Sequence, residues 1–315
     1  MHLHLLLDGD AIACRSAGAV QSQHYRYPHS EYAWFDFPVG VSKQTILKEN
    51  PAIKEEHLEK VIETEDVSHA LQICKNTLQG IQDRVEHKYG DSYVGTSIMS
   101  IYVGNAIKDN FRYQIAKTKP YKSGREGKKP ILTDAVLEYM VGYHNAIVVQ
   151  GEEAEDRVSY RNMHLLGFNS DEVVPIMVHI DKDLNNTPGW HYNFVKDELY
   201  LVSTFKAAYN FYHQMLTGDS TDTIPGLPGI GKKRADAKLA KHKSIEQMHN
   251  TVFQEYANYY NLDLGTAKKI FLEQGQLLWI RRKQGEIWDG NWKRESETEI
   301  IDGEEYLTRS GADSM

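Results

Sequence analysis

Short apolar runs alternate with amphipathic segments along the first 180 residues. The apolar runs predict strands at residues 2–7, 97–103, 146–150 and 173–180. Apolar residues at helical spacing predict helices at residues 66–88, 135–144 and 153–166, after a small-residue segment at 11–17. This order of strands and helices favours an α/β fold with a mostly parallel central sheet flanked by helices.

The rest of the chain departs from this pattern. Residues 21–51 are aromatic, contain proline and lack a clear period, so we expect an irregular insertion with a hairpin. Further on, we expect a hairpin at 190–202, a helix at 207–216, a glycine-rich turn at 225–231 and more helices to about residue 282. The C-terminal region is therefore predicted to be α-helical.

The composition is that of an ordinary globular protein. The 315 residues are 41% hydrophobic and 25% charged, which excludes disorder over the bulk of the chain. The apolar run Leu5–Leu7 is too short for a membrane span, so no membrane partner is expected. Cys14 and Cys74 form no disulfide framework, and this fits a reducing cytoplasm.

The net charge of −8 argues at first against a nucleic-acid binder, but the charges are unevenly distributed. Residues 108–129 carry a local charge of +6 and residues 228–243 carry +5, whereas the tail at 286–315 carries −6. Two concentrated basic segments are therefore available for a polyanion such as DNA.

Acidic residues gather where the predicted strands end. Asp8 follows the first strand, residues 152–156 follow the third, and Asp181 and Asp183 follow the fourth, while Asp219 and Asp222 come after a helix. The carboxyl ends of parallel strands open on one crevice, so one site could gather these side chains. Crowded carboxylates raise each other's pKa unless cations balance them, and oxygen ligands suit Mg²⁺ or Mn²⁺. Two such ions would hydrolyse a phosphodiester by a two-metal mechanism.

Each acidic segment also has an ordinary structural explanation. Asp8 alone fits a turn or a helix cap, residues 152–156 fit acids in a first helical turn, and Asp219 and Asp222 fit a turn. Their joint placement with the basic segments favours the site.

Six short pieces of sequence, taken in order, resemble the 5′-nuclease (flap endonuclease) superfamily, most closely the short bacteriophage 5′–3′ exonucleases. They span about residues 3–239, apart from residues 21–91. The pieces are Leu7-Asp8-Gly9, Val103-Gly104-Asn105 with Phe111-Arg112, Tyr121-Lys122-Ser123-Gly124-Arg125, Gly151 to Asp156, Asp181-Lys182-Asp183, and Gly218-Asp219 to Asp222 running into Gly229-Ile230-Gly231.

The resemblance implies a PIN-like α/β nuclease domain, a helical arch over a carboxylate-lined site, and a helix–hairpin–helix that grips duplex DNA, often with bound K⁺. It implies that two Mg²⁺ ions, with Mn²⁺ as a substitute, are held or oriented by one group of residues, Asp8, Glu153, Glu155 and Asp156, and by a second group, Asp181, Asp183, Asp219 and Asp222.

The same resemblance implies how the substrate is held. Lys122 and Arg125 would lie beside the scissile phosphate and stabilise transition-state charge. The DNA-binding residues would be Arg112, Tyr121, Gly229, Gly231, Lys232 and Lys233. Even without the resemblance, the glycine turn before Lys232 and Lys233 is suited to a phosphate, although it also fits a tight turn with a solvated basic face.

Two residues differ from the family pattern. Asn105 stands where the family usually has Asp, and Glu155 also replaces an Asp. Asn105 would still offer a carbonyl oxygen, so we treat it as an uncertain metal ligand, and the first metal site loses one negative charge.

These observations predict a Mg²⁺-dependent 5′–3′ exonuclease or flap endonuclease that leaves 5′-phosphate products. Its partners would be DNA with 5′ ends, flaps or duplex–single-strand junctions, with RNA–DNA hybrids and replication proteins as further candidates. Asn105 motivates one alternative, a non-catalytic protein that binds branched DNA. Asp8-Gly9-Asp10 motivates another, a haloacid-dehalogenase-type phosphatase in which Asp8 is the nucleophile.

We expect three regions: a catalytic α/β domain at 1–203 with its arch at about 105–145, a helical DNA-binding region at 204–285, and an acidic tail at 286–315. We expect the protein in the cytoplasm, which would be the host's if the source is viral. The insertion at 21–65 and the acidic tail have no functional interpretation from sequence.

Overall fold

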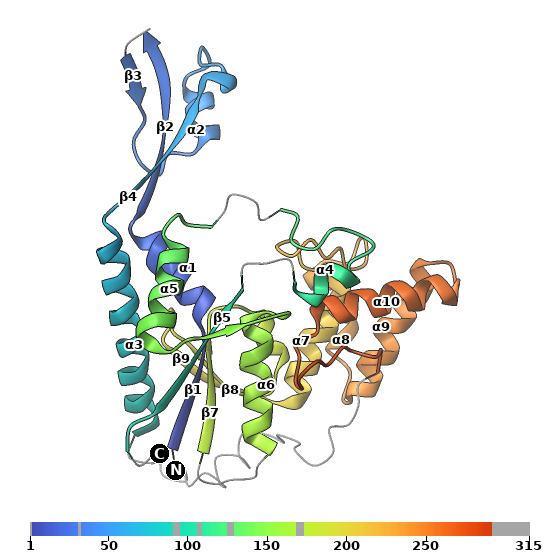
Figure 1. The fold of residues 1–315 in the computed structure, drawn as a ribbon. Coiled ribbons are helices and arrows are strands. Elements are labelled where there is room, and N and C mark those ends of the chain that lie inside the picture. Colours follow the sequence, from blue (N-terminus) through green and yellow to red (C-terminus); the bar gives the residue numbers. More distant parts are fainter. Residues whose placement is uncertain are drawn as a thin grey trace. The chain divides into compact units, whose positions relative to one another are not determined.

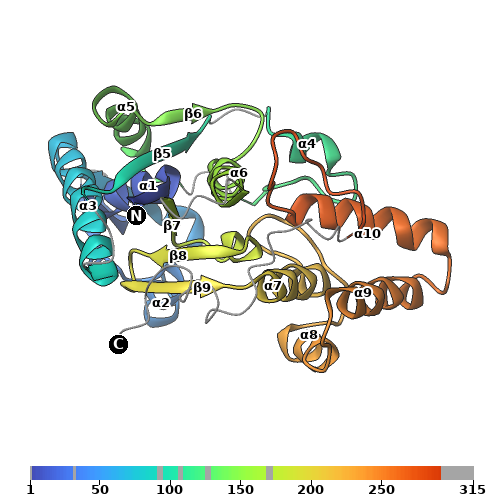
Figure 2. The ribbon, with the colours of Figure 1, turned by 90° about the horizontal axis from the view of Figure 1, so that it is seen from below.

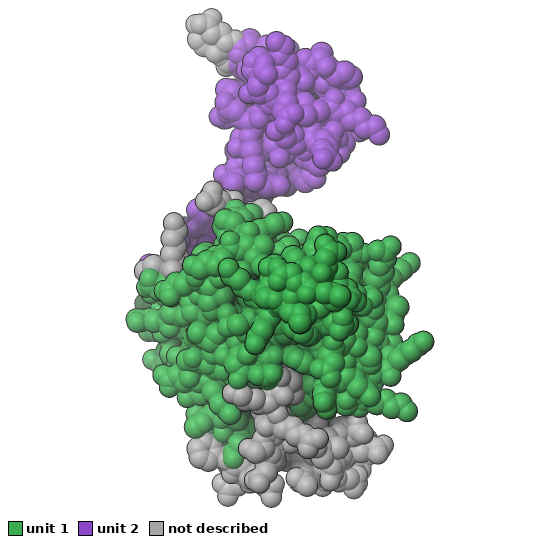
Figure 3. All heavy atoms as spheres, turned by 90° about the vertical axis from the view of Figure 1, so that its right-hand side faces the viewer, with its two compact units in different colours: residues 1–11, 79–128, 140–315 green, residues 12–78, 129–139 purple. Residues whose placement is uncertain are grey.

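The computed structural model describes residues 2–30, 33–90, 95–105, 109–124, 129–167 and 173–291. The chain forms two compact units (Figure 3). Unit 1 comprises residues 1–11, 79–128 and 140–315, and unit 2 comprises residues 12–78 and 129–139. Helices α1 (Gly9–Ala19), α3 (Val67–Tyr89) and α5 (Thr133–His144) each contribute residues to both units.

A six-stranded sheet forms the centre of unit 1 (Figure 1). Its order is β6-β5-β1-β7-β8-β9, and every neighbouring pair is parallel except β8 and β9. The strands are β1 (His2–Asp8), β5 (Ile98–Gly104), β6 (Ile147–Val149), β7 (Val173–His179), β8 (Gly189–Asn193) and β9 (Glu198–Val202). The predicted fold class, a mostly parallel sheet flanked by helices, is confirmed.

Burial explains why the central strands read as continuous apolar runs. The four leucines of β1 are fully buried, as expected for a parallel strand that is covered on both faces. On one face, side chains of the sheet pack against Ala154 and Val158 of α6 (Ala154–Gly167). Directly after β1, Gly9 lies so close to the neighbouring strand that a Cβ atom would come within 2.8 Å of the Tyr102 carbonyl oxygen. The chain therefore turns sharply at the carboxyl end of β1.

The helical part of unit 1 has its own apolar core, in which Phe211, Tyr256, Phe271 and Trp288 are buried. Figure 2 shows its four longer helices grouped beyond the sheet. The elements are α4 (Phe111–Ile115), the 3₁₀ turn η3 (Asp183–Asn186), α7 (Thr204–Thr217), α8 (Lys232–Leu239), α9 (Ile245–Tyr259) and α10 (Leu264–Leu278). The helical C-terminal region is thus confirmed, although it lies in the same compact unit as the sheet.

Unit 2 contains a second, antiparallel sheet of three strands in the order β3-β2-β4. Its elements are β2 (Gln21–Ser30), β3 (Ala33–Asp36), α2 (Lys43–Glu49), the 3₁₀ turn η1 (Glu55–His57) and β4 (Glu59–Thr64). A small core of Phe37, Ile46 and Leu58 lies beside Tyr25 and Tyr27 of β2. The insertion is therefore more regular than we expected, because β2 pairs with β4, a strand about 35 residues further along the chain.

The other predicted elements differ from the structure mainly at their ends. Helix α5 begins at Thr133 itself, whose hydroxyl donates to the Pro130 carbonyl, so Thr133 is inside the helix rather than its cap. The described part of the predicted tail, 286–291, is folded: the Trp288 ring packs against Gly275, and the Glu286 carboxylate accepts a hydrogen bond from Trp279 Nε1. Among the described residues, no helix is long and apolar enough to cross a membrane.

Candidate active site

The predicted acidic residues lie at one edge of the unit 1 sheet. Asp8 is the last residue of β1, Glu153 lies between β6 and α6, and Asp181 follows β7 by two residues. Because β1, β6 and β7 all belong to the parallel part of the sheet, their carboxyl ends share one edge. Asp219 and Asp222 reach this group from the turn after α7, as their contacts with Lys182 and Tyr121 show.

Three of these carboxyl groups are close enough to repel one another. Asp8 is 3% exposed, and burial, followed by the charges of Asp10 and Asp181, raises its pKa to about 8. Burial is also the main cause that raises the pKa of Glu155, followed by the charges of Asp181 and Asp8. Burial and neighbouring negative charge therefore both disfavour the ionised forms of Asp8 and Glu155.

A lysine that we did not assign to the site lies among the second group of acids. The Lys182 ammonium donates to Asp183 Oδ1 at 2.8 Å and also contacts the Asp219 carboxylate. Burial acts to raise the pKa of Asp219, but Lys182 and the backbone N–H groups of Thr221 and Asp222 outweigh it and lower that pKa. Lys182 therefore stabilises the ionised form of this acid.

Lys122 makes a similar bridge on the other side of the group. Its ammonium contacts the Glu153 carboxylate and lies 3.8 Å from Asp222 Oδ2. The backbone of Lys122 is left-handed, with φ of 54°, and its N–H donates to the Asp222 carbonyl at 3.0 Å. A residue held in this region of φ is uncommon and points to a constrained position.

Tyr121 is buried, which differs from its predicted role as a DNA-binding residue. Its hydroxyl donates to Asp222 Oδ2 at 2.8 Å and lies 3.3 Å from both oxygens of Glu153. The ring is 4% exposed and belongs to the apolar core of the helical part. In this structure the residue contacts two acids of the site.

Arg112 also differs from its predicted role in DNA binding. Its guanidinium forms a two-pronged ion pair with Asp156, at 2.6 and 2.8 Å, and donates to the carbonyls of Leu277 and Trp279. Both charged side chains are almost fully buried. Burial acts to raise the pKa of Asp156, but Arg112 outweighs it and lowers that pKa. Among the acids of the first group, Asp156 is thus already neutralised by the protein.

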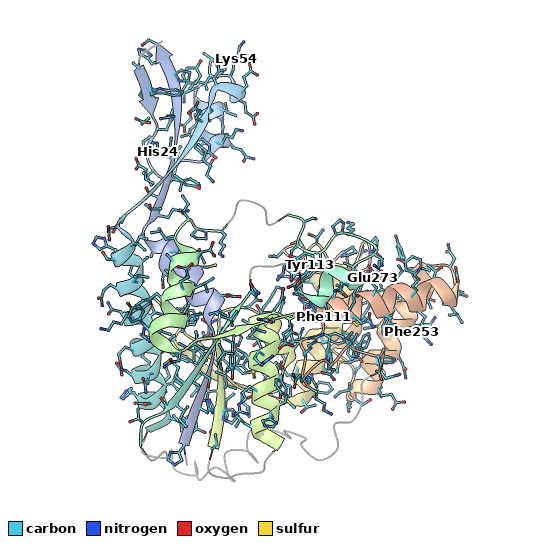
Figure 4. All side chains as sticks on the ribbon, in the orientation of Figure 1. His24, Lys54, Phe111, Tyr113, Phe253 and Glu273 are labelled. Carbon is cyan, nitrogen blue, oxygen red and sulfur yellow. The ribbon has the colours of Figure 1, made fainter. Side chains whose placement is uncertain are left out.

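The segment that carries Lys122 is fastened to α10 by a further residue that the sequence did not reveal. The buried carboxylate of Glu273 accepts hydrogen bonds from the backbone N–H groups of Lys117 and Thr118, at 2.8 and 2.6 Å. Figure 4 shows Glu273 on α10 close to Phe111 and Tyr113 of α4. Nothing in the local sequence marks Glu273, because it contacts residues about 155 positions away.

Glu152 belongs to the structure rather than to the group of carboxylates described above. It forms ion pairs with Arg157 at 2.8 Å and with Arg281 at 3.0 Å. The Arg281 side chain in turn lies over the Phe111 ring, 3.7 Å from its centre. These contacts tie the segment after α10 to the start of α6.

The glycine-rich turn has the open, basic surface that the sequence predicted. Gly218 and Gly226 pack back to back, with left-handed φ values of 71° and 64°, and a Cβ on either would collide with the backbone of the other strand of the turn. Gly229 is also left-handed, with φ of 80°, and Gly231 is the N-cap of α8. The predicted DNA contacts Gly229, Gly231, Lys232 and Lys233 are all exposed.

The remaining predicted residues, Asn105 and Arg125, lie at and beyond the limits of the described ranges. Asn105 is half-buried after β5, where its N–H donates to the Val149 carbonyl at 3.2 Å. Arg125 lies outside the described residues.

The chemistry of the donor set suits a divalent cation, because Mg²⁺ and Mn²⁺ prefer oxygen ligands such as carboxylates. Neighbouring carboxylates also contribute, after burial, to the raised pKa values of Asp8 and Glu155. The donor set is not assembled as a ready metal site. Across the described residues, no group of three or more His, Cys, Asp or Glu side chains is arranged to hold a metal ion. Arg112, Lys122 and Lys182 supply positive charge to these acids instead.

Comparisons with known proteins agree with the resemblance. Flap endonuclease Xni of Shewanella piezotolerans (strain WP3 / JCM 13877) is 24% identical over 205 residues, which are 59% of this chain and 76% of that protein. Flap endonuclease Xni of Shewanella pealeana is 24% identical over 199 residues, covering 58% and 75%. A crystal structure of T5 D15 protein co-crystallized with metal ions aligns at a TM-score of 0.44 and 16% identity, over 88% of this chain and 96% of that one. No protein-family model matches.

The buried pair of Arg112 and Asp156 provides a test of the site's framework. We expect Arg112→Met to lower the free energy of unfolding by about 3–5 kcal/mol, because it leaves a buried carboxylate unpaired. The matched control Lys88→Met removes a more exposed ion pair with Asp197 and should cost much less stability. Urea unfolding at pH 7 measures both values, and equal losses would contradict this role for Arg112.

The same pair predicts a pH dependence. The folded-state pKa of Asp156 is lower than its unfolded value, so the pair stabilises the fold fully above about pH 4 and loses this effect as the pH falls further. The difference in stability between wild type and Arg112→Met should therefore narrow in acid.

Proposed function

The chain belongs to the 5′-nuclease (flap endonuclease) superfamily, and from that premise we propose that it is a divalent-metal-dependent nuclease that cuts DNA at or near 5′ ends. The observation that carries the proposal is the gathering of Asp8, Glu155 and Asp181 at the carboxyl edge of the sheet, where burial and neighbouring negative charge raise the pKa of Asp8 and of Glu155. An uncompensated cluster of this kind fits a site for cations that act on a phosphodiester.

Two groups of residues would hold the ions. The first comprises Asp8, Glu153 and Glu155, with Asn105 as an uncertain ligand, and the second comprises Asp181, Asp183, Asp219 and Asp222. When bound, two Mg²⁺ or Mn²⁺ ions would supply water activation and charge stabilisation for phosphodiester hydrolysis. Asp156, paired with Arg112, would orient the first group rather than bind an ion directly. Its carboxylate accepts a hydrogen bond from the Glu153 N–H at 3.1 Å.

Lys122 would act on the substrate phosphate. Its ammonium already lies beside Glu153 and Asp222, and Tyr121 fixes both acids from the other side. Stabilising the charge that develops on the phosphate oxygens is the chemistry that a lysine contributes at such a position. Arg125 would assist from the same segment.

The turn before α8 would hold the DNA backbone. Exposed Lys232 and Lys233 follow Gly229 and Gly231 at a helix N-terminus, an arrangement suited to phosphates. Arg234 Nη1 donates to the Gly229 carbonyl at 2.7 Å and so supports the turn. By resemblance, a K⁺ ion would bind within this helix–hairpin–helix.

The relatives' name indicates the substrate to test, a 5′-flapped duplex. RNA–DNA hybrids would be cut by the same chemistry, because the attacking water does not need a 2′-hydroxyl. Replication proteins are further candidate partners of the protein. The competing function is a non-catalytic protein that binds branched DNA, which Asn105 and the lysine-bridged acids favour.

The central experiment incubates the protein with a 5′-flapped duplex in Mg²⁺ or in EDTA. We expect cleavage only with the metal, leaving a 5′-phosphate, and a loss of at least about 10³-fold in Asp181→Ala and in Asp219→Ala. Glu198→Ala, an exposed carboxylate on β9, is the control and should keep full activity.

Each alternative has its own outcome in this experiment. Tight binding without cleavage would favour the non-catalytic function. Hydrolysis of a small phosphate monoester that is lost in Asp8→Asn would favour a phosphatase.

A single and a double variant separate chemistry from DNA binding. Lys122→Ala should lower the single-turnover rate by about 10²-fold or more and leave duplex affinity nearly unchanged. The double variant Lys232→Ala with Lys233→Ala should weaken binding and reduce the salt slope by about 1 for each lysine, with little change in the saturated rate. A result in which both variants change only the affinity would contradict the role of Lys122.

A further inference from the structure

Lys182 lies between two acids that come from distant parts of the chain. Its ammonium contacts Asp183, the residue that directly follows it in the chain, and Asp219, which lies in the turn after α7. The ammonium therefore places a positive charge where a bound cation would place one in the second group of acids.

The two acids are held in place without help from the lysine. The Gln214 amide donates to Asp183 at 2.7 Å and to Asp219 at 3.1 Å, and the Thr221 N–H donates to Asp219 at 2.8 Å. The Asp183 N–H is in turn bound by Asp181 at 2.9 Å. These carboxylates should therefore keep their positions when the ammonium leaves.

The lysine side chain, by contrast, is the exposed member of the trio. It is 66% exposed, against 16% for Asp183 and 3% for Asp219. Water can therefore solvate the ammonium as it moves away from the two acids. A divalent ion brings twice the charge to the same oxygens, so it competes well for them.

We propose that Lys182 is an internal counter-ion of the metal-free protein, which neutralises Asp183 and Asp219 and must be displaced when a divalent ion binds them. This rests on the proposed function, since it requires these acids to be metal ligands. It adds that Lys182 sets the affinity of the second metal group, and that metal binding frees an ammonium group at the edge of the site.

Lys122 is not equivalent, although it also bridges two acids. Its side chain is 15% exposed, and its left-handed backbone is fixed by a hydrogen bond to Asp222. The easily displaced counter-ion is therefore Lys182.

The test measures Mn²⁺ binding to the metal-stripped full-length protein by titration calorimetry. Lys182→Met keeps an apolar stem and removes the charge, and it should bind Mn²⁺ about tenfold more tightly at one site. Lys182→Arg keeps the charge and should show no such gain. Lys196→Met, an exposed lysine in the turn between β8 and β9, is the matched control and should match the wild type.

Thermal melting gives a second readout that does not depend on activity. In EDTA, Lys182→Met should melt below the wild type, because Asp183 and Asp219 then repel each other without a counter-charge. With Mn²⁺, its melting temperature should rise by more than that of the wild type.

The outcomes separate this inference from the function it rests on. Equal or weaker Mn²⁺ binding by Lys182→Met, with normal binding by the wild type, overturns the counter-ion role alone. Absence of Mn²⁺ binding in both proteins at millimolar concentrations overturns the metal-dependent function as well.

Discussion

Repulsion between carboxylates at the carboxyl edge of the sheet is the constraint on which the rest of the site depends. The parallel strands bring Asp8 and Asp181 to one edge, and the start of α6 adds Glu155 beside them. Burial of these groups removes the water that would otherwise screen their charges, and it raises the pKa of Asp8 and Glu155, with a further contribution from the charge of Asp181. A counter-charge at this edge has to come from basic side chains or from bound cations.

To the neighbouring acids of the site, the protein supplies positive charge from three basic side chains that differ in exposure. Arg112, Lys122 and Lys182 are 1%, 15% and 66% exposed. Arg112 is fixed by a two-pronged pair and two carbonyls, which makes it a permanent part of the framework. The backbone of Lys122 is held by a hydrogen bond, and its ammonium lies near two acids of the site, Glu153 and Asp222. This is the position from which we propose that it acts on a phosphate bound beside these acids. Lys182 is mostly in water and is the one that a cation replaces at least cost.

The net charge of −8 also takes on a different meaning. Leaving out the tail at 286–315 brings the chain to −2, and leaving out the eight acids proposed as ligands brings the remainder to +6. Much of the negative charge therefore belongs to the acids proposed as cation ligands, and the exposed lysines of α8 are available for the proposed DNA contacts.

The sequence was a good guide wherever a local pattern determines the structure. The buried leucines of β1, the amphipathic α3 and α6 and the hairpin of β8 and β9 all follow from short-range spacing. The sheet of unit 2 was missed because β2 pairs with β4 across α2, and no local period reports such a pairing.

For the candidate site, the sequence indicated which acids lie together but not the partners of each residue. The acids after the strands do lie at one edge of the sheet. Arg112 and Tyr121 were predicted to contact DNA, since their burial depends on α10 and the core of the helical part, which no local pattern reports. The role of Glu273 could not be predicted from the sequence, because its hydrogen-bond partners are about 155 positions away in the chain. Lys182 could have been found, since a lysine between two aspartates in a predicted cation site is already a charge partner.

The most direct measurement of the central claim is anomalous X-ray diffraction from crystals grown with Mn²⁺. If cations relieve the crowding at this edge, manganese peaks will lie against the carboxylates of Asp8, Glu155 and Asp181 and against Asp183 and Asp219, with the Lys182 ammonium withdrawn from Asp219. Crystals that show no manganese at these acids, with Lys182 still bridging Asp183 and Asp219 at saturating Mn²⁺, would contradict the account.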